Sequence, residues 1–134
     1  ENFRAAFHHF DPDIIAGWGD AETEISLQNA GIIRHRSKIE GAFSSARAWQ
    51  LIEREQGFGA FIWSFVKGTT IQNTWQDPAE VPNTSPNAQA LSKALKKRGF
   101  KFCGPTITYA FMQATGLVND HVITCPKHPK NQGR

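Results

Sequence analysis

Apolar side chains recur every three or four residues along most of the chain, which is the spacing of one helix face. The clearest stretch predicts a long helix from about Ser37, whose apolar face consists of Ile39, Ala42, Phe43, Ala46, Trp49 and Ile52. A further face is formed by Phe58, Phe61, Ile62 and Phe65 and ends at Lys67-Gly68. No stretch shows convincing alternation with a period of two, so the pattern predicts an all-α fold.

The first thirty residues predict three shorter helices. Phe3, Ala6, Phe7 and Phe10 share the spacing of one face. Asp11-Pro12 combines a helix cap with a proline in the first helical position, which predicts a second helix. Asp20 is expected to cap a third helix, which ends near Ala30-Gly31.

The stretch from Thr69 to Pro86 is rich in proline, asparagine, threonine and serine, so it predicts a long connection without regular structure. Ser85-Pro86 then repeats the cap-and-proline signature and begins a helix with a buried stripe of Ala88, Leu91, Ala94 and Leu95. We expect a single helical domain spanning residues 1–134, because 134 residues match the usual size of one domain. Within it we distinguish a hairpin at about 93–116 and a tail at about 117–134.

The hairpin contains a short Gly-x-x-x-x-Gly turn between two helices. Gly99 is expected at the end of the first helix, where a left-handed backbone is cheap only for glycine. Gly104 allows a close approach to another group, and Pro105 suits the start of the next helix. The apolar face of that helix is predicted as Ile107, Phe111 and Ala114, and Tyr109 is left open between the core and a pocket.

Charge is distributed unevenly along the chain. Residues 1–80 carry eleven acidic and seven basic side chains, whereas residues 81–119 carry no acidic side chain and five basic ones, Lys93, Lys96, Lys97, Arg98 and Lys101. Clustered cations beside the free amides of a helix start suit a polyanion such as a nucleic-acid backbone. The alternative is an ordinary solvated helix face. The loop Arg34–Arg36 is also basic and has the same two interpretations.

The two cysteines, Cys103 and Cys125, are too few for a disulfide framework, which favours a reducing compartment and a cytoplasmic location. No run of about eighteen apolar residues predicts a membrane span. His121-x-x-x-Cys125 has ligand types and a spacing that zinc accepts, and His128 is a candidate third ligand. The alternative is a free histidine and a free cysteine in a polar tail.

Several segments together resemble the bacterial DNA-3-methyladenine glycosylase I family, a group of helix-hairpin-helix glycosylases. The resemblance runs from Asn2 to Cys125 and is most specific in the segments FRAAFHHFDP, NAGIIRHRSKI, LSKALKKRGFKFCGPT and YAFMQATGLVNDH. It implies hydrolysis of the bond between 3-methyladenine and deoxyribose in alkylated double-stranded DNA, after the damaged nucleotide is flipped into a pocket. It also implies that the hairpin grips DNA phosphates through Lys97, Gly99, Lys101, Gly104 and Thr106.

Related glycosylases place a catalytic aspartate after the hairpin, and Asn119 stands at that place here. The family is known for lacking this aspartate, and its cationic substrate base leaves more readily than an unmodified one. We expect the neighbouring Asp120 to be a helix cap or a partner of a ligand histidine. The resemblance places the base-recognising glutamate and tryptophan before the position of Glu1. No catalytic residue is therefore expected in these 134 residues, which we expect to be inactive alone and to be part of a longer protein.

The resemblance further implies that His121 and Cys125 are half of a structural zinc clasp, whose other two ligands also lie before the position of Glu1. The protein is expected to act as a monomer. The main alternative is a non-catalytic helix-hairpin-helix module that binds DNA without releasing a base. A purely structural zinc module gains less support, because the chain offers no set of four ligands.

Overall fold

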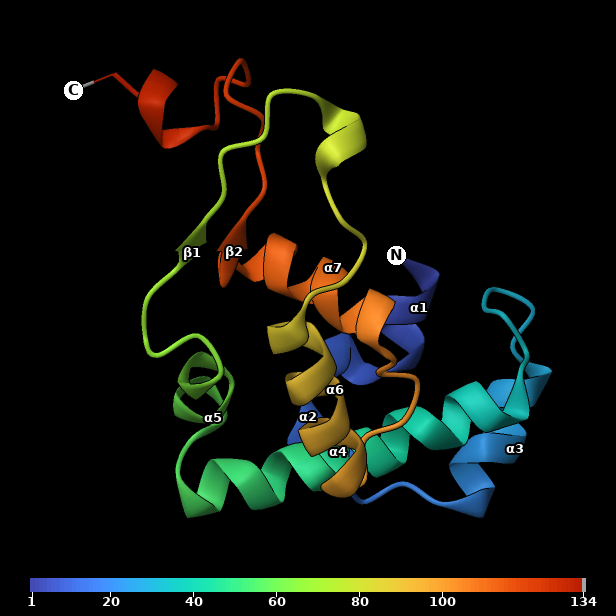
Figure 1. Cartoon of the computed structure of the whole chain (residues 1–134). Helices are drawn as coiled ribbons and strands as arrows, with labels where there is room; N and C mark the ends of the chain where they lie inside the picture. Colours follow the sequence, from blue (N-terminus) through green and yellow to red (C-terminus); the bar gives the residue numbers. More distant parts are fainter. Residues whose placement is uncertain (134) are drawn as a thin grey trace. The chain divides into compact units, whose positions relative to one another are not determined.

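The structure is a computed structural model that describes residues 1–133, and it is mostly helical (Figure 1). Its α-helices are α1 (Asn2–Ala6), α2 (Pro12–Ile15), α3 (Asp20–Gln28), α4 (Arg36–Glu55), α5 (Phe58–Ser64), α6 (Pro86–Lys97) and α7 (Pro105–Thr115). Short 3-10 turns occupy His8–Phe10, Pro78–Glu80 and Pro129–Asn131. The predicted helical class is confirmed, although β1 (Ile71–Gln72) and β2 (Val118–Asn119) form a small parallel pair that the pattern did not predict.

The chain forms two compact units, each built from two segments. The first unit comprises Glu1–Phe58 and Ala94–Cys103, and the second comprises Gly59–Lys93 and the chain from Gly104 onward. Helix α6 contributes to both units, since the division falls between Lys93 and Ala94. The number of independently folding domains stays a prediction.

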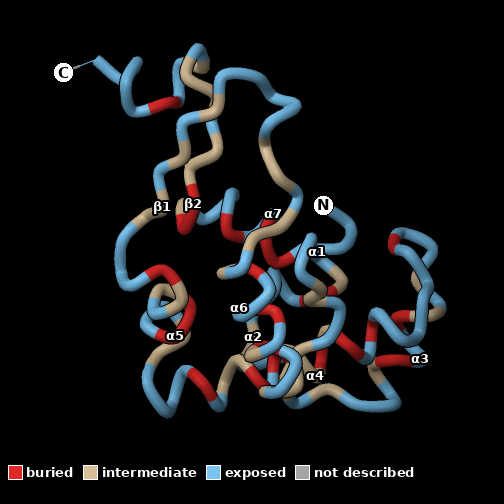
Figure 2. The backbone as a smooth tube through the Cα atoms, viewed as in Figure 1, coloured by how far each residue is buried: buried red, intermediate tan, exposed pale blue. Residues whose placement is uncertain are grey.

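The first unit is organised on α4, the longest helix. α2 and α3 both contact α4, and buried positions recur along its length (Figure 2). The core cluster of this unit consists of Phe7, Ile15, Ile32, Ile39, Phe43 and Ala46. The hydrophobic spacing of α4 therefore predicted the helix, which begins one residue before the expected Ser37. Of the predicted face, Ala42 and Trp49 are only partly buried, and the buried Gly41 and Ala48 were not predicted.

The N-terminal segment differs from its prediction. α1 ends at Ala6, and the next turn holds His8, His9 and Phe10 in the left-handed region, with φ of 46°, 56° and 62°. Phe7 is fully buried, and its ring lies 4.5 Å from that of Phe3 in a stacked pair. A continuous helix is wrong here, because tertiary packing of Phe7 overrides the local periodicity.

The predicted helix starts are confirmed where proline follows a polar cap. The Asp11 carboxylate accepts from the Asp13 N–H at 2.9 Å, and the Ser85 hydroxyl accepts from the Ala88 N–H at 3.1 Å. The expected cap at Asp20 is wrong by one residue. Gly19 caps α3, and the Glu22 carboxylate accepts from the Gly19 N–H at 2.8 Å, which lowers the Glu22 pKa.

In the second unit, α7 buries a different face from the predicted one. Thr108, Tyr109 and Met112 are buried, whereas Ile107 is 60% exposed and Phe111 is 36% exposed. Because α7 carries apolar side chains around much of its circumference, periodicity did not identify the buried face. Tyr109 belongs to the core of this unit. Among residues 1–133, no helix is long and apolar enough to span a membrane.

Candidate functional site

The turn that follows α6 adopts the backbone expected for its first glycine. Gly99 has φ of 101°, and its N–H donates to the Lys96 carbonyl at 3.1 Å. The Phe100 N–H donates to the Leu95 carbonyl at 3.1 Å, so the carbonyls of Leu95 and Lys96 in the last turn have partners. The left-handed conformation predicted for Gly99 is confirmed.

The cations of this segment divide into one paired group and four unpaired ones. Arg98 forms an ion pair with Glu55, with 2.7 Å between Nη2 and Oε2. Lys93, Lys96, Lys97 and Lys101 are exposed, and none forms an ion pair within residues 1–133. Four uncompensated ammonium groups within nine residues remain free for an external anion.

Helix α7 begins with donors that no protein group uses. Gly104 is the N-cap and provides no side-chain bond, and Pro105 occupies the first turn. In the described part of the chain, the backbone N–H groups of Thr106 and Ile107 have no acceptor. Such donors at the positive end of a helix dipole suit a phosphate.

Gly104 has no structural need to be glycine. Its φ of −62° is accessible to any residue, and a Cβ built on it would meet no atom within 4 Å. The predicted close approach is thus not to another part of this chain. The space beside Gly104 is open to a ligand.

Asp120 is the most heavily bonded side chain of the second unit. Its Oδ1 accepts from Asn73 Nδ2 at 2.7 Å and from Trp75 Nε1 at 2.8 Å. Its Oδ2 accepts from the Tyr109 hydroxyl and from Gln113 Nε2 at 3.0 Å. Asp120 therefore joins the segment after β1 to α7. The expected role of a helix cap is wrong, because all four donors are side chains of non-adjacent residues.

These hydrogen bonds control the ionisation of the pair Asp120 and Tyr109. Partial burial would raise the Asp120 pKa, but the bonds from Trp75, Tyr109, Asn73 and Gln113 outweigh it and lower the pKa. Burial raises the Tyr109 pKa, and the bond to Asp120 and its negative charge raise it further. A carboxylate held by four donors is a weak base, so the contacts favour a structural role over proton abstraction.

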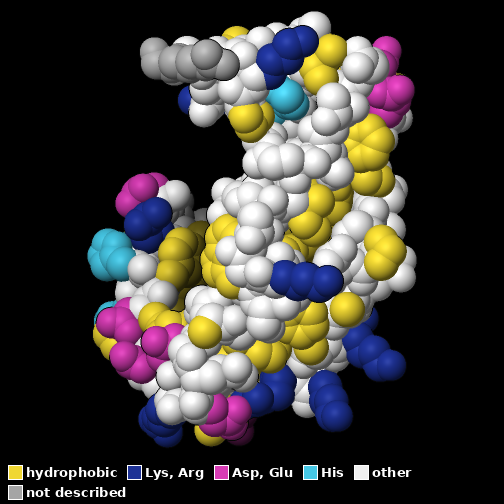
Figure 3. All heavy atoms as spheres, turned by 60° about the vertical axis from the view of Figure 1, so that its left-hand side comes forward, with side chains coloured by type: hydrophobic (Ala, Val, Ile, Leu, Met, Phe, Trp, Pro, Cys, Tyr) yellow, Lys and Arg dark blue, Asp and Glu magenta, His cyan; other side chains and the backbone are white. Residues whose placement is uncertain are grey.

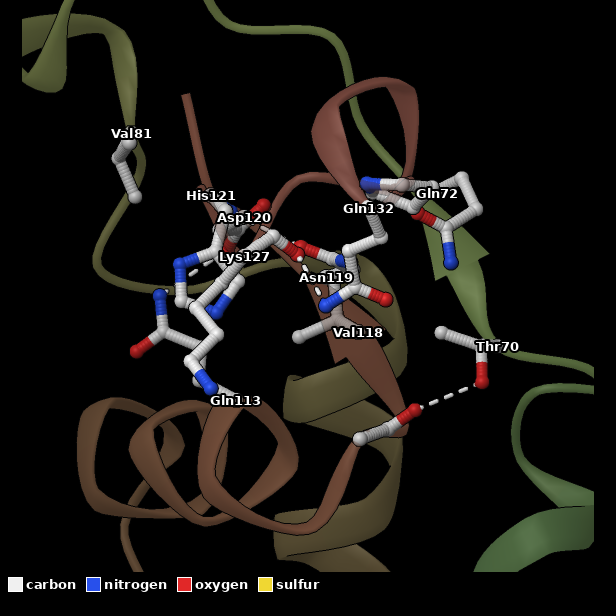
Figure 4. Close-up of a pocket in the computed structure, with 12 residues that line it drawn as sticks. Thr70, Gln72, Val81, Gln113, Val118, Asn119, Asp120, His121, Lys127 and Gln132 are labelled. Atoms are coloured by element: carbon white, nitrogen blue, oxygen red, sulfur yellow. Dashed lines mark hydrogen bonds between the residues drawn. The ribbon is translucent and has the colours of Figure 1, made fainter. Parts of the chain in front are cut away.

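A polar pocket of about 600 Å³ lies beside Asp120 in the second unit (Figure 4). The Gln113, His121 and Lys127 side chains gather on one side, and the Thr70 hydroxyl donates to the Gly116 carbonyl at 2.8 Å on another. Asn119 also lines the pocket, and its side-chain oxygen accepts from the His121 N–H at 3.1 Å. Asn119 is therefore a neutral amide whose side-chain oxygen is already bonded to the backbone.

The structure brings His121 and Cys125 together. Their Nδ1 and Sγ atoms lie 3.6 Å apart. A tetrahedral zinc ion with Zn–S of about 2.3 Å and Zn–N of about 2.0 Å requires an N···S edge of about 3.5 Å. The pair therefore fits one edge of a zinc site.

His128 does not join this pair. No group of three or more His, Cys, Asp or Glu side chains suited to a metal is found in the described residues. His128 is instead buried, and its Nδ1 accepts from the Lys130 N–H at 3.2 Å as a helix cap. Its candidacy as a third ligand alongside His121 and Cys125 is wrong.

Sequence reasoning missed a residue that shapes the loop carrying the two candidate ligands, His121 and Cys125. Asn131 Nδ2 donates to the Ile123 carbonyl at 2.6 Å and to the Cys125 carbonyl at 2.9 Å. These bonds hold the loop that carries the two candidate ligands. An asparagine six residues from a cysteine gives no pattern that would have revealed this.

Several large hydrophobic side chains remain exposed, and hydrophobic atoms are visible on the face drawn in Figure 3. In the turn after α6, Phe102 is 53% exposed and has φ of 55°. Burial alone does not explain its backbone conformation, which is unfavourable for a side chain with a Cβ.

Comparison with known proteins gives consistent matches along this chain. The family profile described as methyladenine glycosylase matches residues 1–128. DNA-3-methyladenine glycosylase 1 of Escherichia coli (strain K12) is 48% identical over 133 residues, which cover 98% of this chain and 71% of that protein.

Solved structures of related enzymes share the fold. A crystal structure of 3-methyladenine DNA glycosylase I matches with a TM-score of 0.91 and 51% identity over 96% of this chain and 71% of that one. A variant of 3-methyladenine DNA glycosylase I in complex with 3-methyladenine matches with a TM-score of 0.90 and 31% identity, over 96% of this chain and 69% of that one. By sequence and by structure, the chain belongs to the methyladenine glycosylase family.

Proposed function

We propose that this protein is a base-excision repair enzyme that hydrolyses the N-glycosidic bond of 3-methyladenine in alkylated double-stranded DNA. The observation that carries the proposal is the family match over residues 1–128, together with 48% identity to a DNA-3-methyladenine glycosylase. A related enzyme has been solved with 3-methyladenine bound, which supports the same substrate. A flipped nucleotide is the expected reacting form, because the bond is inaccessible inside a duplex.

In this proposal, residues 97–106 are a helix-hairpin-helix grip on the DNA backbone. Lys97 and Lys101 are exposed and supply charge, while the Thr106 amide supplies an unpaired donor. Gly99 provides the left-handed backbone, and Gly104 leaves open space for a phosphate. Backbone contacts of this kind position a protein on DNA without reading its sequence.

The part of the enzyme that recognises the base is proposed to precede the position of Glu1. We accordingly expect these 134 residues alone to release no 3-methyladenine. Asn119 and Asp120 are not proposed as catalytic residues, because the first is a neutral amide and the second is held by four donors.

We also propose that His121 and Cys125 contribute two of the four ligands of a structural zinc ion. Their 3.6 Å separation supports this role. Such an ion would stabilise the fold and would take no part in the hydrolysis. A monomeric state and a cytoplasmic location complete the proposal.

The test is release of free 3-methyladenine from methylated duplex DNA, measured by mass spectrometry on the protein expressed from its complete reading frame. The proposal predicts release, and it predicts slower release for Lys101→Glu. The competing function, a non-catalytic DNA-binding module, predicts salt-dependent duplex binding with no released base. Binding without release would therefore overturn the proposed enzyme.

A further inference from the structure

One face in the middle of α4 carries four small side chains in succession. Gly41, Ser44, Ser45 and Ala48 stand at i, i+3, i+4 and i+7, which places them on one side of the helix. This face lies opposite the stripe of Ile39, Phe43 and Ala46, which belongs to the core cluster, and Ile52 continues the line of the four residues toward the end of the helix. We call these four residues the α4 seat.

Two hydroxyl groups of the α4 seat bond to the turn that follows α6. The Ser44 hydroxyl donates to the Gly99 carbonyl at 2.9 Å. The Lys101 N–H donates to the Ser45 hydroxyl at 3.2 Å. Both bonds join residues more than fifty positions apart and act on the backbone of the turn, so they fix its position on α4.

The other two members of the seat allow a close approach. A Cβ built on Gly41 would lie 2.9 Å and 3.0 Å from two carbons of the Phe102 ring, and 3.2 Å from the Lys101 Cβ. A Cβ built on Gly99 would lie 3.8 Å from the Ala48 Cβ. A larger side chain at Gly41 would therefore push the Phe102 ring and the turn away from the helix.

The turn adopts a conformation that it would not keep unaided. Gly99 has φ of 101° and Phe102 has φ of 55°. The left-handed region is unfavourable for phenylalanine and persists only where surrounding contacts impose it. Because Phe102 is half exposed, we attribute its left-handed backbone to its close contact with Gly41 and to the adjoining hydrogen bond from the Lys101 N–H to the Ser45 hydroxyl.

We propose that the α4 seat is a positioning site that holds the turn at residues 99–102 in the form that grips DNA. This inference rests on the proposed function of the turn. The seat fixes the backbone that carries Lys101 before DNA binds. Binding therefore does not have to order this backbone, and the entropy cost of binding is lower. Loosening the turn lowers the fraction of molecules that are competent to bind, and the apparent affinity falls by the same factor.

The test uses the protein expressed from its complete reading frame and a fluorescently labelled DNA duplex at fixed salt. Ser44→Ala and Ser45→Ala are each expected to weaken duplex binding about threefold to tenfold, which corresponds to the loss of one hydrogen bond. The dependence of affinity on salt is expected to stay unchanged, because neither variant removes a phosphate contact. Amide NMR signals of residues 99–102 are expected to shift in the DNA-free protein.

A second pair of variants separates the seat from general destabilisation. Gly41→Ala is expected to weaken binding about tenfold or more, and Gly41→Ala combined with Phe102→Gly is expected to recover most of the affinity. The added glycine removes the clashing ring and tolerates the positive φ. Gly59→Ala is the matched control, because it also places a methyl group on a helical glycine but meets no atom within 4 Å.

Three results would overturn the inference. The first is that Ser44→Ala and Ser45→Ala bind the DNA duplex with wild-type affinity although the amide NMR signals of residues 99–102 have shifted. The second is an equal loss of affinity in Gly41→Ala and its Phe102→Gly combination. The third applies if the wild-type protein binds no DNA duplex, which would refute the proposed function itself. In that case, amide NMR signals of residues 99–102 that do not shift in Ser44→Ala and Ser45→Ala, measured without DNA, would refute the α4 seat.

Discussion

Removing the carboxylate of Asp120 is expected to destabilise the second unit strongly. Asp120→Ala deletes the shared acceptor of four side chains, two from the segment after β1 and two from α7. Each donor then loses the carboxylate oxygen that it bonds in the structure. Water can replace the acceptor only where the donor reaches solvent.

The burial of each donor sets the size of the effect. Tyr109 is 2% exposed, so its hydroxyl loses its partner without access to bulk water, at a cost of about 1–3 kcal/mol. The half-buried Trp75 indole and Asn73 amide together add about 1 kcal/mol, and the exposed Gln113 adds little. The sum of about 3 kcal/mol corresponds to a fall in Tm of roughly 10 °C for a chain of this size.

Thermal unfolding followed by circular dichroism measures this loss. Tyr109→Phe removes the buried donor together with its need for an acceptor, so it is expected to cost only about 1 kcal/mol. Gln113→Ala and Asp13→Ala, which each remove one partner of an exposed hydrogen bond, are expected to stay within about 0.5 kcal/mol of wild type. A Tm for Asp120→Ala within 2–3 °C of the wild type would refute the assignment of Asp120 as a structural anchor.

Three further predictions concern the turn and the tail. Gly104→Ala is expected to leave Tm unchanged and to weaken duplex binding at least threefold. Gly99→Ala is expected to lower Tm by roughly 3–6 °C, because the φ of Gly99 is positive. Equal Tm values for the two variants would contradict this difference. Lys97→Glu is expected to weaken binding and to reduce the salt slope by about one, and Lys67→Glu, the same change outside the turn, is expected to have a smaller effect on both measurements. An anomalous scattering scan at the zinc edge is expected to detect zinc in the complete protein and none in Cys125→Ser. Absence of a zinc signal from the wild-type protein, together with reaction of Cys125 with thiol reagents, would refute the proposed zinc site.

Local signals explain why most helix starts were predictable. Pro12, Pro86 and Pro105 each occupy the first turn of a helix, and proline prefers that position whatever its tertiary surroundings. The left-handed Gly99 is a similar case, because the preference belongs to the residue itself. Such features could be located from the sequence without knowledge of the rest of the fold.

Tertiary contacts explain where the sequence analysis failed. The left-handed turn at His8–Phe10 arises beside the buried Phe7, and the spacing of the phenylalanines alone resembled a helix. In α7, the buried position of Tyr109 depends on the acceptor Asp120, which lies outside the helix. Periodicity reports a buried face only when the opposite face is polar, and α7 lacks that contrast.

The candidate site shows the same division. The resemblance to a family predicted a DNA-binding role for the turn and a zinc-binding role for His121 and Cys125, and the structure places Nδ1 and Sγ of that pair 3.6 Å apart. The seat on α4 was not predicted, because Ser44 and Ser45 bond to residues more than fifty positions away. Small polar residues on a helix carry no sequence signal for such a partner.

We propose above that residues 97–106 hold the DNA backbone. The most direct measurement is a titration of the isotopically labelled protein with a short DNA duplex, followed through its amide NMR signals. If the turn binds DNA, the unpaired amides of Thr106 and Ile107 and those of the neighbouring turn will shift strongly, with little change around Cys125. Shifts confined to other parts of the protein, with the turn unchanged at saturating DNA, would contradict it.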